Sequence, residues 1–439
     1  MLLLAAAALL PAGYLLATAL PILGQGGWLL HFAQNSLPHQ ALRSASIALQ
    51  AAAVAFAVGA VPAVAVSRFD FRGARLVSVL ALLPLLMAPF VTVGLWTVAF
   101  SAAFFDSSHA LAIQQGLACS PYVFIVFRIA AARIPGAHAK LAAGLGWGFG
   151  QRLLRVHLPT YAVPAAAALM IVVAQTVGDY AAADRLGIET ISVGMHNLWL
   201  ASQSSSVAAI VSVVLTVPSV LLVIVAAWAS TRLLSQSPVP PAAAAASRQR
   251  LAGPAAWAWV GWSLLGSLPA FWVPEALTLR WAWLNWQRTR FAAIPGDMLQ
   301  AATTALCTAL LVGAVCTLTA LLLRSGGPVR SSGPSRWAER APWLFLCNYF
   351  LPSLVLALAF VMMSRDGSVG ARLLGPLRDS RLLIVLAEAL RFMPLAMLPL
   401  LDALRRTPPT MVEVARAFGA GPLRARGVAW PCAGRPGQL

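Results

Sequence analysis

The sequence predicts an all-α integral membrane protein made of two tandem halves, and three observations lead to this fold class. Only 10% of the 439 residues are charged, whereas a soluble globular chain carries about 25%. Sixty per cent are hydrophobic, which is more apolar surface than one water-soluble core can bury. Long uncharged runs also separate short arginine clusters. Lipid is therefore the expected solvent for much of the chain.

Ten membrane spans are expected, because a spanning helix needs about 20 predominantly apolar residues and the charges leave ten such runs. They lie at about residues 2–23, 44–66, 76–100, 111–131, 160–180, 206–230, 255–273, 298–323, 343–363 and 382–401. The first run also fits a cleaved signal peptide, since Ala17-Thr18-Ala19 resembles a cleavage site. A retained helix is favoured because no basic residue precedes this run, which is long for such a signal.

The basic residues set the expected orientation. The chain has 31 Lys+Arg against 13 Asp+Glu, and Lys140 is its only lysine. With the N-terminus in the cytoplasm, 20 basic residues fall in cytoplasmic segments and nine on the opposite side, as the positive-inside rule requires. The clusters form no basic stripe, so nucleic acid is not an expected partner. Five cysteines without a C-x-x-C pair and six scattered histidines predict no metal site, disulfide framework or cofactor.

A Pro/Ala/Ser-rich stretch between Arg232 and Arg250 predicts a cytoplasmic linker. It divides the chain into a first half at 1–231 with six helices, the linker at 232–252, and a second half at 253–439 with four helices and a loop. Two further helices are expected after Pro159, whereas eight residues follow Pro431. The expectation is therefore a truncated or frameshifted second half, which is C-terminally incomplete.

An internal repeat relates the two halves. A shift of 273 residues superimposes four pairs, namely Gln115 on Glu388, Pro121 on Pro394, Pro135 on Pro408 and Gly146 on Gly419. Coincidences at one offset indicate a repeat, and each copy runs from an expected span into the cytoplasmic loop behind it. The two halves therefore face the same way.

The two repeated loops share one order of residue types. Small residues open a short helix, a glycine permits a left-handed turn, and alternating basic and apolar residues precede a proline that starts the next span. The residues of the first loop are Lys140, Leu141, Ala142, Gly146, Leu158 and Pro159, and those of the second are Glu413, Ala415, Gly419 and Pro431. The alternative without a specific function is an amphipathic loop that lies on the membrane surface and binds no partner.

Both loops resemble the EAA motif of binding-protein-dependent ABC transporter permeases, in which a glycine follows Glu-Ala-Ala and a Leu-Pro ends the loop. Lys140 replaces the glutamate in the first copy, and Trp430-Pro431 arrives one residue early in the second. The resemblance covers most of the chain and is sharpest in these loops. It implies that both loops are coupling helices docked on a cytoplasmic ABC ATPase dimer, and that a periplasmic substrate-binding protein delivers the solute.

Tandem permeases with both halves in one chain look like the iron(III) and thiamine importers, which makes these the leading substrate guesses. The resemblance also implies a multi-pass protein of the bacterial inner membrane. Gln175-Thr-Val-Gly-Asp179-Tyr180 is similar to an Asp-Tyr or Asp-Phe step at the outer end of the fifth helix of a half. The motif itself does not identify the substrate, because the ATPase binds the loop and the cargo does not.

Polar residues inside expected spans are candidates for the translocation path, because they are costly in lipid. Glu388 and Arg391 are three residues apart and can neutralise each other, either along a path or as a structural ion pair. Gln175 and Asp179 face one side near a span end, where Asp179 can also reach water. Gln115, the repeat equivalent of Glu388, can also bond a neighbouring helix.

The chain has no G-x-x-x-x-G-K-[ST] motif, so ATP hydrolysis is expected on a separate chain and this subunit is not expected to be an enzyme. A secondary transporter built from parallel repeats is the chief alternative. A truncated permease without transport activity is another. A membrane enzyme is disfavoured because no catalytic cluster is present.

Overall fold

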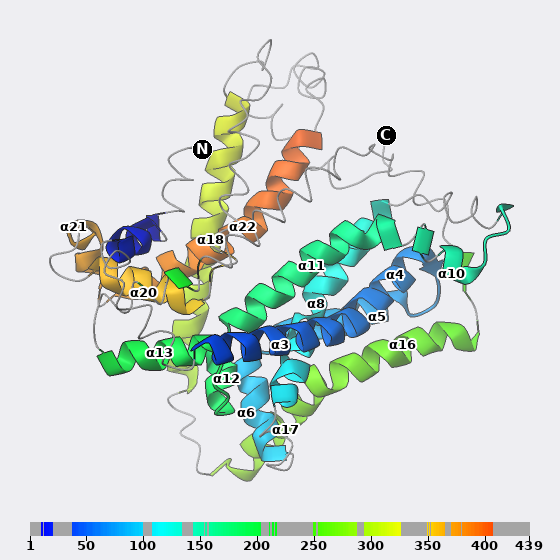
Figure 1. The fold of residues 1–439 in the computed structure, drawn as a ribbon, viewed down its shortest axis with the longest axis horizontal. Coiled ribbons are helices and arrows are strands. Elements are labelled where there is room, and N and C mark those ends of the chain that lie inside the picture. The colour runs from blue at the N-terminus through cyan, green and yellow to red at the C-terminus, as the bar shows by residue number, and fades with distance from the viewer. Residues whose placement is uncertain are drawn as a thin grey trace. The chain divides into compact units, whose positions relative to one another are not determined.

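A computed structural model describes most of the chain, and its regular structure is almost entirely helical (Figure 1). The described residues are 10–20 except 12, 37–99, 108–133, 144–155 except 153, 158–202, four residues between 210 and 216, 249–287 except 252, 294–325, 349–364 except 350 and 352, and 370–406 except 379. They form two compact units. One holds Leu15–Arg290 with Phe350–Leu358, and the other holds Met1–Tyr14, Phe291–Tyr349 and Ala359–Leu439.

The first long span of the larger unit is one helix with a local change of winding. α3 (Leu37–Ala55) continues through the π-helical turn η1 (Phe56–Ala60) into α4 (Val61–Arg68). Residues Pro38–Arg68 are long and apolar enough to cross a membrane. The short strand β1 (Phe69–Asp70) follows, and it pairs in parallel with β2 (Gln249–Arg250).

The run expected as one span at 76–100 forms two helices bent by 90°. α5 (Ala74–Leu82) and the 3-10 turn η2 (Leu83–Leu86) precede the bend, and α6 (Pro89–Ala99) follows it. Pro89 has no N–H group to continue the preceding helix, and its ring disfavours a helical conformation at Ala88. These two constraints explain why a continuously apolar run does not form one straight helix.

α8 (Ser108–Arg133) is the most buried of the long apolar helices, and small residues bring it close to α3. A Cβ atom added to Gly116 would lie 2.6 Å from the carbonyl oxygen of Ala51, and one added to Gly59 would overlap the carbonyl oxygen of Ser120. Backbones approach this closely only where side chains are absent or small. The glycines therefore fix the α3–α8 contact on which the polar site described below depends.

Four more helices are described in the first-half part of this unit. They are α10 (Phe149–Arg152), α11 (Leu158–Gly178), α12 (Tyr180–Arg185) and α13 (Ile191–Ser202). α11 packs against both α3 and α8. An apolar cluster joins the three helices, with Ala55 from α3, Val123 from α8, and Ala168 and Val172 from α11.

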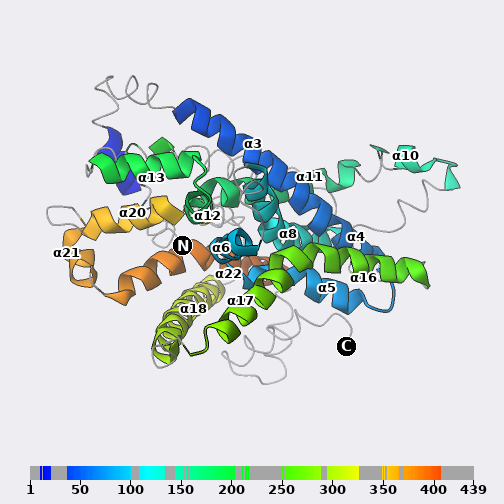
Figure 2. The same ribbon diagram turned by 90° about the horizontal axis from the view of Figure 1, so that it is seen from below.

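The expected span at 255–273 lies in a helix that packs with the first-half helices. α16 (Pro254–Ser267) continues through the π-helical turn η4 (Leu268–Trp272) into α17 (Val273–Leu284). α16 lies beside α5 (Figure 2). The larger unit thus extends past the expected linker and includes the first helix assigned to the second half.

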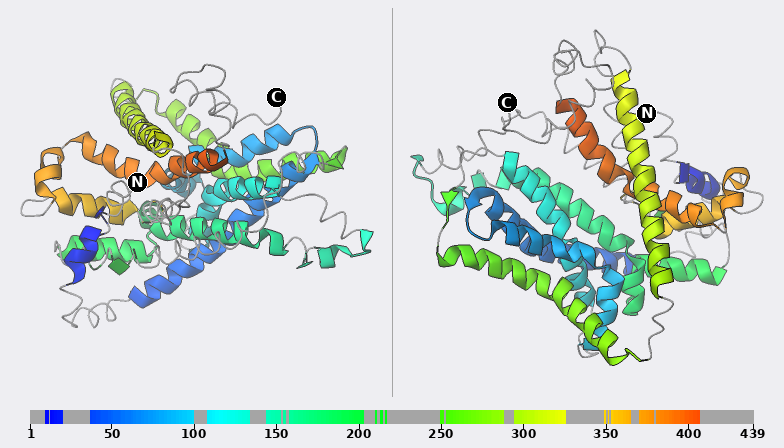
Figure 3. Two further views of the ribbon diagram at one scale, coloured as in Figure 1. Left: turned by 90° about the horizontal axis from the view of Figure 1, so that it is seen from above. Right: turned by 180° about the vertical axis from the view of Figure 1, so that it is seen from behind.

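The smaller unit is dominated by two long helices, α18 (Ile294–Ser325) and α22 (Arg381–Arg406), which pack together (Figure 3). Val312 and Cys316 of α18 share an apolar cluster with Ala389 and Met397 of α22. α21 (Ala371–Leu374) and the 3-10 turn η5 (Gly375–Leu377) precede α22. α20 (Ser353–Ser364) is a shorter apolar helix that overlaps the expected span at 343–363, and its residues are divided between the two units.

The described part of the chain is therefore mostly helical and contains four helices able to cross a membrane, or five if the bent pair counts as one span. These are Pro38–Arg68, Ser108–Ala131, Pro159–Gly178 and Ile294–Ala320, with Ala74–Leu86 plus Pro89–Ala99 as the bent pair. Most of the expected span at 206–230 and the linker lie outside the described residues. The total of ten spans stays a prediction.

Candidate functional site

The first repeated loop is described from Gly144 onward, so Lys140, Leu141 and Ala142 lie outside the described residues. Gly146 has φ +74°, and nothing lies within 4 Å of a Cβ atom built on it. Its backbone conformation, rather than close packing, is what favours glycine at this position. The expected left-handed turn is therefore present.

The loop then continues into the short helix α10. Arg155 places its guanidinium carbon 5.5 Å from the centre of the Trp147 ring, which is a cation–π contact. Leu158 and Pro159 are the first two residues of α11, and proline fits this position because the first N–H groups of a helix have no helical partner. In the second loop, Glu413, Ala415, Gly419 and Pro431 lie outside the described residues.

Two residues singled out separately in the sequence, Gln115 and Asp179, meet at a partly buried polar contact. The Gln115 side chain is 2% exposed and its Nε2 donates a hydrogen bond of 2.5 Å to Asp179 Oδ2. The other carboxylate oxygen of Asp179 accepts a 3.1 Å bond from the backbone N–H of Ala182. Asp179 is thus the N-cap of α12, and it breaks the helix between α11 and α12. One carboxylate both redirects the chain and binds α8.

Gln175 and Tyr180 flank this contact. Gln175 is half-buried one turn before Asp179 on α11. The ring of Tyr180 lies 4.2 Å from that of His196 on α13, centre to centre. Burial and the nearby negative charge of Asp184 raise the pKa of Tyr180. Burial also lowers the pKa of His196, although Asp184 opposes this effect.

Several buried polar side chains near these helices were not singled out from the sequence. The backbone N–H of Ile191 donates to Ser44 Oγ at 2.9 Å, and Ser192 Oγ donates to the Val177 carbonyl, so α13 is bonded to α3 and α11. Gln114 Nε2 donates to the Pro89 carbonyl at 3.3 Å. The adjacent pair Gln114-Gln115 in an apolar run was the sequence signal that could have found Gln114.

Four buried polar atoms on these helices have no hydrogen-bond partner within the described structure. They are Gln40 Oε1, Gln114 Oε1, Thr176 Oγ1 and His196 Nδ1. A buried polar group without a partner is unfavourable, and more so where no water is present. Four such groups on α3, α8, α11 and α13 make this end of the helices a candidate solute-binding region.

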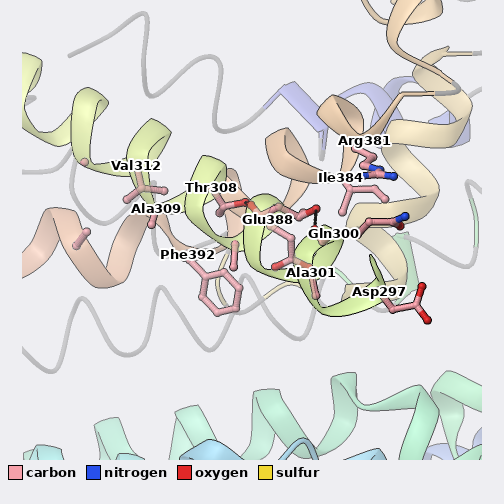
Figure 4. Close-up of a pocket in the computed structure, with 14 residues that line it drawn as sticks. Asp297, Gln300, Ala301, Thr308, Ala309, Val312, Arg381, Ile384, Glu388 and Phe392 are labelled. Carbon is pink, nitrogen blue, oxygen red and sulfur yellow. Dashed lines mark hydrogen bonds between the residues drawn. The ribbon is translucent and has the colours of Figure 1, made fainter. Parts of the chain in front are cut away.

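Glu388 occupies a different setting from Gln115. It lies in a groove of about 1050 Å³ between α18 and α22 (Figure 4). Asp297, Gln300 and Arg381 lie toward one end of the groove, with the apolar Ile384 among them, and Ala309 and Val312 lie toward the other end. The groove gives Glu388 an open side.

Arg391 does not line this groove. Although the structure describes both side chains, it shows no ion pair between Glu388 and Arg391. The Arg391 guanidinium carbon instead lies 5.8 Å from the centre of the Phe392 ring, and its Nε is buried without a hydrogen-bond partner. The two residues are therefore close in sequence but do not neutralise each other by direct contact.

Within the described residues, no group of three or more His, Cys, Asp or Glu side chains could hold a metal ion. Comparisons of the chain with protein-family models, curated proteins and solved structures find no match. The resemblance to permeases therefore depends on the two loops and the repeat.

Proposed function

We propose that this chain is the membrane-spanning permease subunit of an ATP-driven ABC importer in a bacterial inner membrane, with its N-terminus in the cytoplasm. The loop that ends in Leu158-Pro159 carries the proposal. It combines the left-handed Gly146, the short helix α10 and a proline start to a spanning helix, in the order expected for a coupling loop. The same order of residue types occurs a second time in the sequence.

α11 offers a direct mechanical link from this loop to the contact between Gln115 and Asp179. The helix starts at Leu158, immediately behind the loop, and ends at Gly178, next to Asp179. At 1.5 Å per residue its length is about 30 Å, which matches the apolar thickness of a bilayer. A displacement of the loop would therefore move Asp179 relative to Gln115 on α8.

In this mechanism the chain carries out no covalent chemistry. A dimer of separate ATPase subunits binds both loops, and its ATP-driven closure alternates the access of a central path. A periplasmic substrate-binding protein delivers a small solute, with thiamine or iron(III) as the leading candidates. The polar groups near Gln115 and Asp179 would contact the solute.

The test is purification of the full chain from its native membrane, followed by identification of any subunit with an ATP-binding motif. Gly146→Val should reduce recovery of that subunit and uncouple transport from ATP hydrolysis, because a β-branched residue is strained at φ +74°. Gly146→Asn is the matched control, because asparagine tolerates the left-handed region. Recovery of the chain without any ATPase, or equal behaviour of both variants, would contradict the proposal.

Secondary transport is a second candidate, favoured by the partly buried carboxylate of Asp179 at the end of a spanning helix. Purified chain in lipid vesicles distinguishes the two mechanisms. Uptake driven by an ion gradient without ATPase would support secondary transport, and uptake only with ATPase and ATP would support the importer.

A further inference from the structure

The internal repeat extends to the ends of two helices. α8 (Ser108–Arg133) and α22 (Arg381–Arg406) are both 26 residues long, and their first and last residues differ by 273 positions, which is the repeat offset. Each also packs against a long apolar helix that precedes it in the chain, α3 for α8 and α18 for α22. The two helices can therefore be compared position by position.

One face of each helix makes the same kind of contact. Gly116 of α8 lies against Ala51 of α3, and its equivalent Ala389 shares a cluster with Val312 of α18. One further pair is Phe124 and Met397, which are both fully buried. This shared face is the one that holds the preceding long helix.

The other face differs between the halves. In α8 it meets the segment from α11 to α12: Gln115 bonds Asp179, Leu111 shares an apolar cluster with Ala182 of α12, and Cys119 shares one with Ala168 and Val172 of α11. The equivalents in α22 line the groove, namely Ile384, Glu388 and Phe392 for Leu111, Gln115 and Cys119. Thus the positions covered by α11 and α12 in the first half form the open groove wall in the second.

The opposite wall of the groove suits a helix. Ala301, Ala305, Ala309 and Gly313 of α18 recur every fourth residue and all line it. Small residues at this spacing let a second helix backbone approach closely.

We infer that the groove between α18 and α22 is the docking site of a further membrane-spanning helix, which packs there as α11 packs on α3 and α8. This inference goes beyond the proposed transport function, because it concerns helix assembly and holds for any transport mechanism.

The kind of polar group that the docked helix carries follows from the replacement of Gln115 by Glu388 in the second copy of the repeat. Gln115 donates its hydrogen bond to a carboxylate, whereas an ionised Glu388 can only accept. The neighbouring hydroxyls of Thr304 and Thr308 already donate to carbonyl oxygens of α18, at 2.8 Å and 2.9 Å. The docked helix therefore carries a donor, either a cationic or an amide side chain, at the place where α11 leads into Asp179.

A single-span probe tests this inference in the full chain. The probe is an epitope-tagged copy of residues 158–185, made with native Asp179 or with Asp179→Lys, and co-expressed in the same membrane. A photo-cross-linking residue replaces Phe392 in the groove or, as the control, Leu310, which is 63% exposed on α18 and does not line the groove.

The Asp179→Lys probe should cross-link to position 392 about five times more than the native probe, because it gives Glu388 a donor instead of a second carboxylate. Glu388→Gln should remove that preference, and position 310 should capture little of either probe. Equal capture from positions 392 and 310 would overturn the inference. Capture of lipid alone, or of a second copy of the chain in place of the probe, would do the same.

Discussion

α8 and α22 occupy equivalent places in the repeat, yet their surroundings differ sharply. Of the apolar window in Pro38–Arg68, the long helix that packs on α8, 44% is buried, whereas only 11% is buried in Ile294–Ala320, the long helix that packs on α22. Gln115 has an acceptor on the neighbouring segment, and Glu388 faces a groove. The comparison indicates that the second face of the repeated helix is covered by other helices in the first half and lines a groove in the second.

The largest expected effect comes from removing Asp179. Asp179→Ala should destabilise the larger unit by about 2–4 kcal/mol, because α12 loses its N-cap and Gln115 is left buried without its acceptor. Glu388→Ala should change stability by about 0.5 kcal/mol or less, since no partner is lost. Thermal unfolding of both variants in detergent measures the difference. Equal destabilisation by both variants would contradict the difference between the two halves.

The next effect concerns close helix contact. Gly116→Ala places a methyl group 2.6 Å from backbone and side-chain atoms of α3, and should destabilise by about 1–3 kcal/mol. Gly313→Ala is the matched control, because nothing lies within 4 Å of a Cβ atom there. It should be neutral or stabilising by up to about 1 kcal/mol, as alanine favours helix. Chemical denaturation that ranks the two variants the other way would show that α3 and α8 are not in close contact.

A smaller effect should follow from Trp262→Phe. The indole Nε1 of Trp262 on α16 donates a 3.1 Å hydrogen bond to the carbonyl of Ala57 in the π-helical turn η1. Loss of this bond should cost about 0.5–1 kcal/mol. Trp257→Phe, at a residue 64% exposed on the same helix, should cost less in the same unfolding assay. A reversed order would argue against the packing of α16 on the first-half helices.

The smallest effect is a pH dependence that belongs to the first half. Burial lowers the pKa of folded His196 from its ordinary value of 6.5. The unfolded chain then binds more protons than the folded chain as pH falls below that value. The free energy of unfolding should therefore be highest above pH 6.5 and decrease below it. His196→Phe should flatten the decrease between pH 7 and pH 5, measured as the melting temperature across buffers. An unchanged pH profile would show that His196 is not the group responsible.

Much of the helical arrangement follows from the sequence because charges interrupt the apolar runs. The runs at 111–131, 160–180, 298–323 and 382–401 lie within or nearly within α8, α11, α18 and α22. The bend before Pro89 and the π-helical turns were not predicted, because hydropathy measures composition and not backbone geometry. The ends of individual helices depend on such local geometry.

The candidate site was only partly predictable. Gln115 and Asp179 were singled out as polar residues in apolar runs, but their contact joins positions 64 residues apart, and helix packing determines it. Gln40 and Thr176 were missed because a single amide or hydroxyl in an apolar run is common and becomes informative only when burial leaves it without a partner. That Glu388 faces a groove could not be predicted from the sequence, because it depends on which helices pack against α22.

The most direct test of the difference between the halves compares thiol reactivity at two repeat-equivalent positions. Cys119 is 3% exposed in the apolar cluster that α8 shares with α3 and α11, and its equivalent Phe392 is 41% exposed in the groove. In variants of the purified chain with a single cysteine, either native Cys119 or Phe392→Cys, the rate of modification by N-ethylmaleimide is measured in detergent. The groove position should react at least about tenfold faster, because access controls thiol reactivity. Equal rates, or a faster reaction at Cys119, would contradict an open second half beside a covered first half.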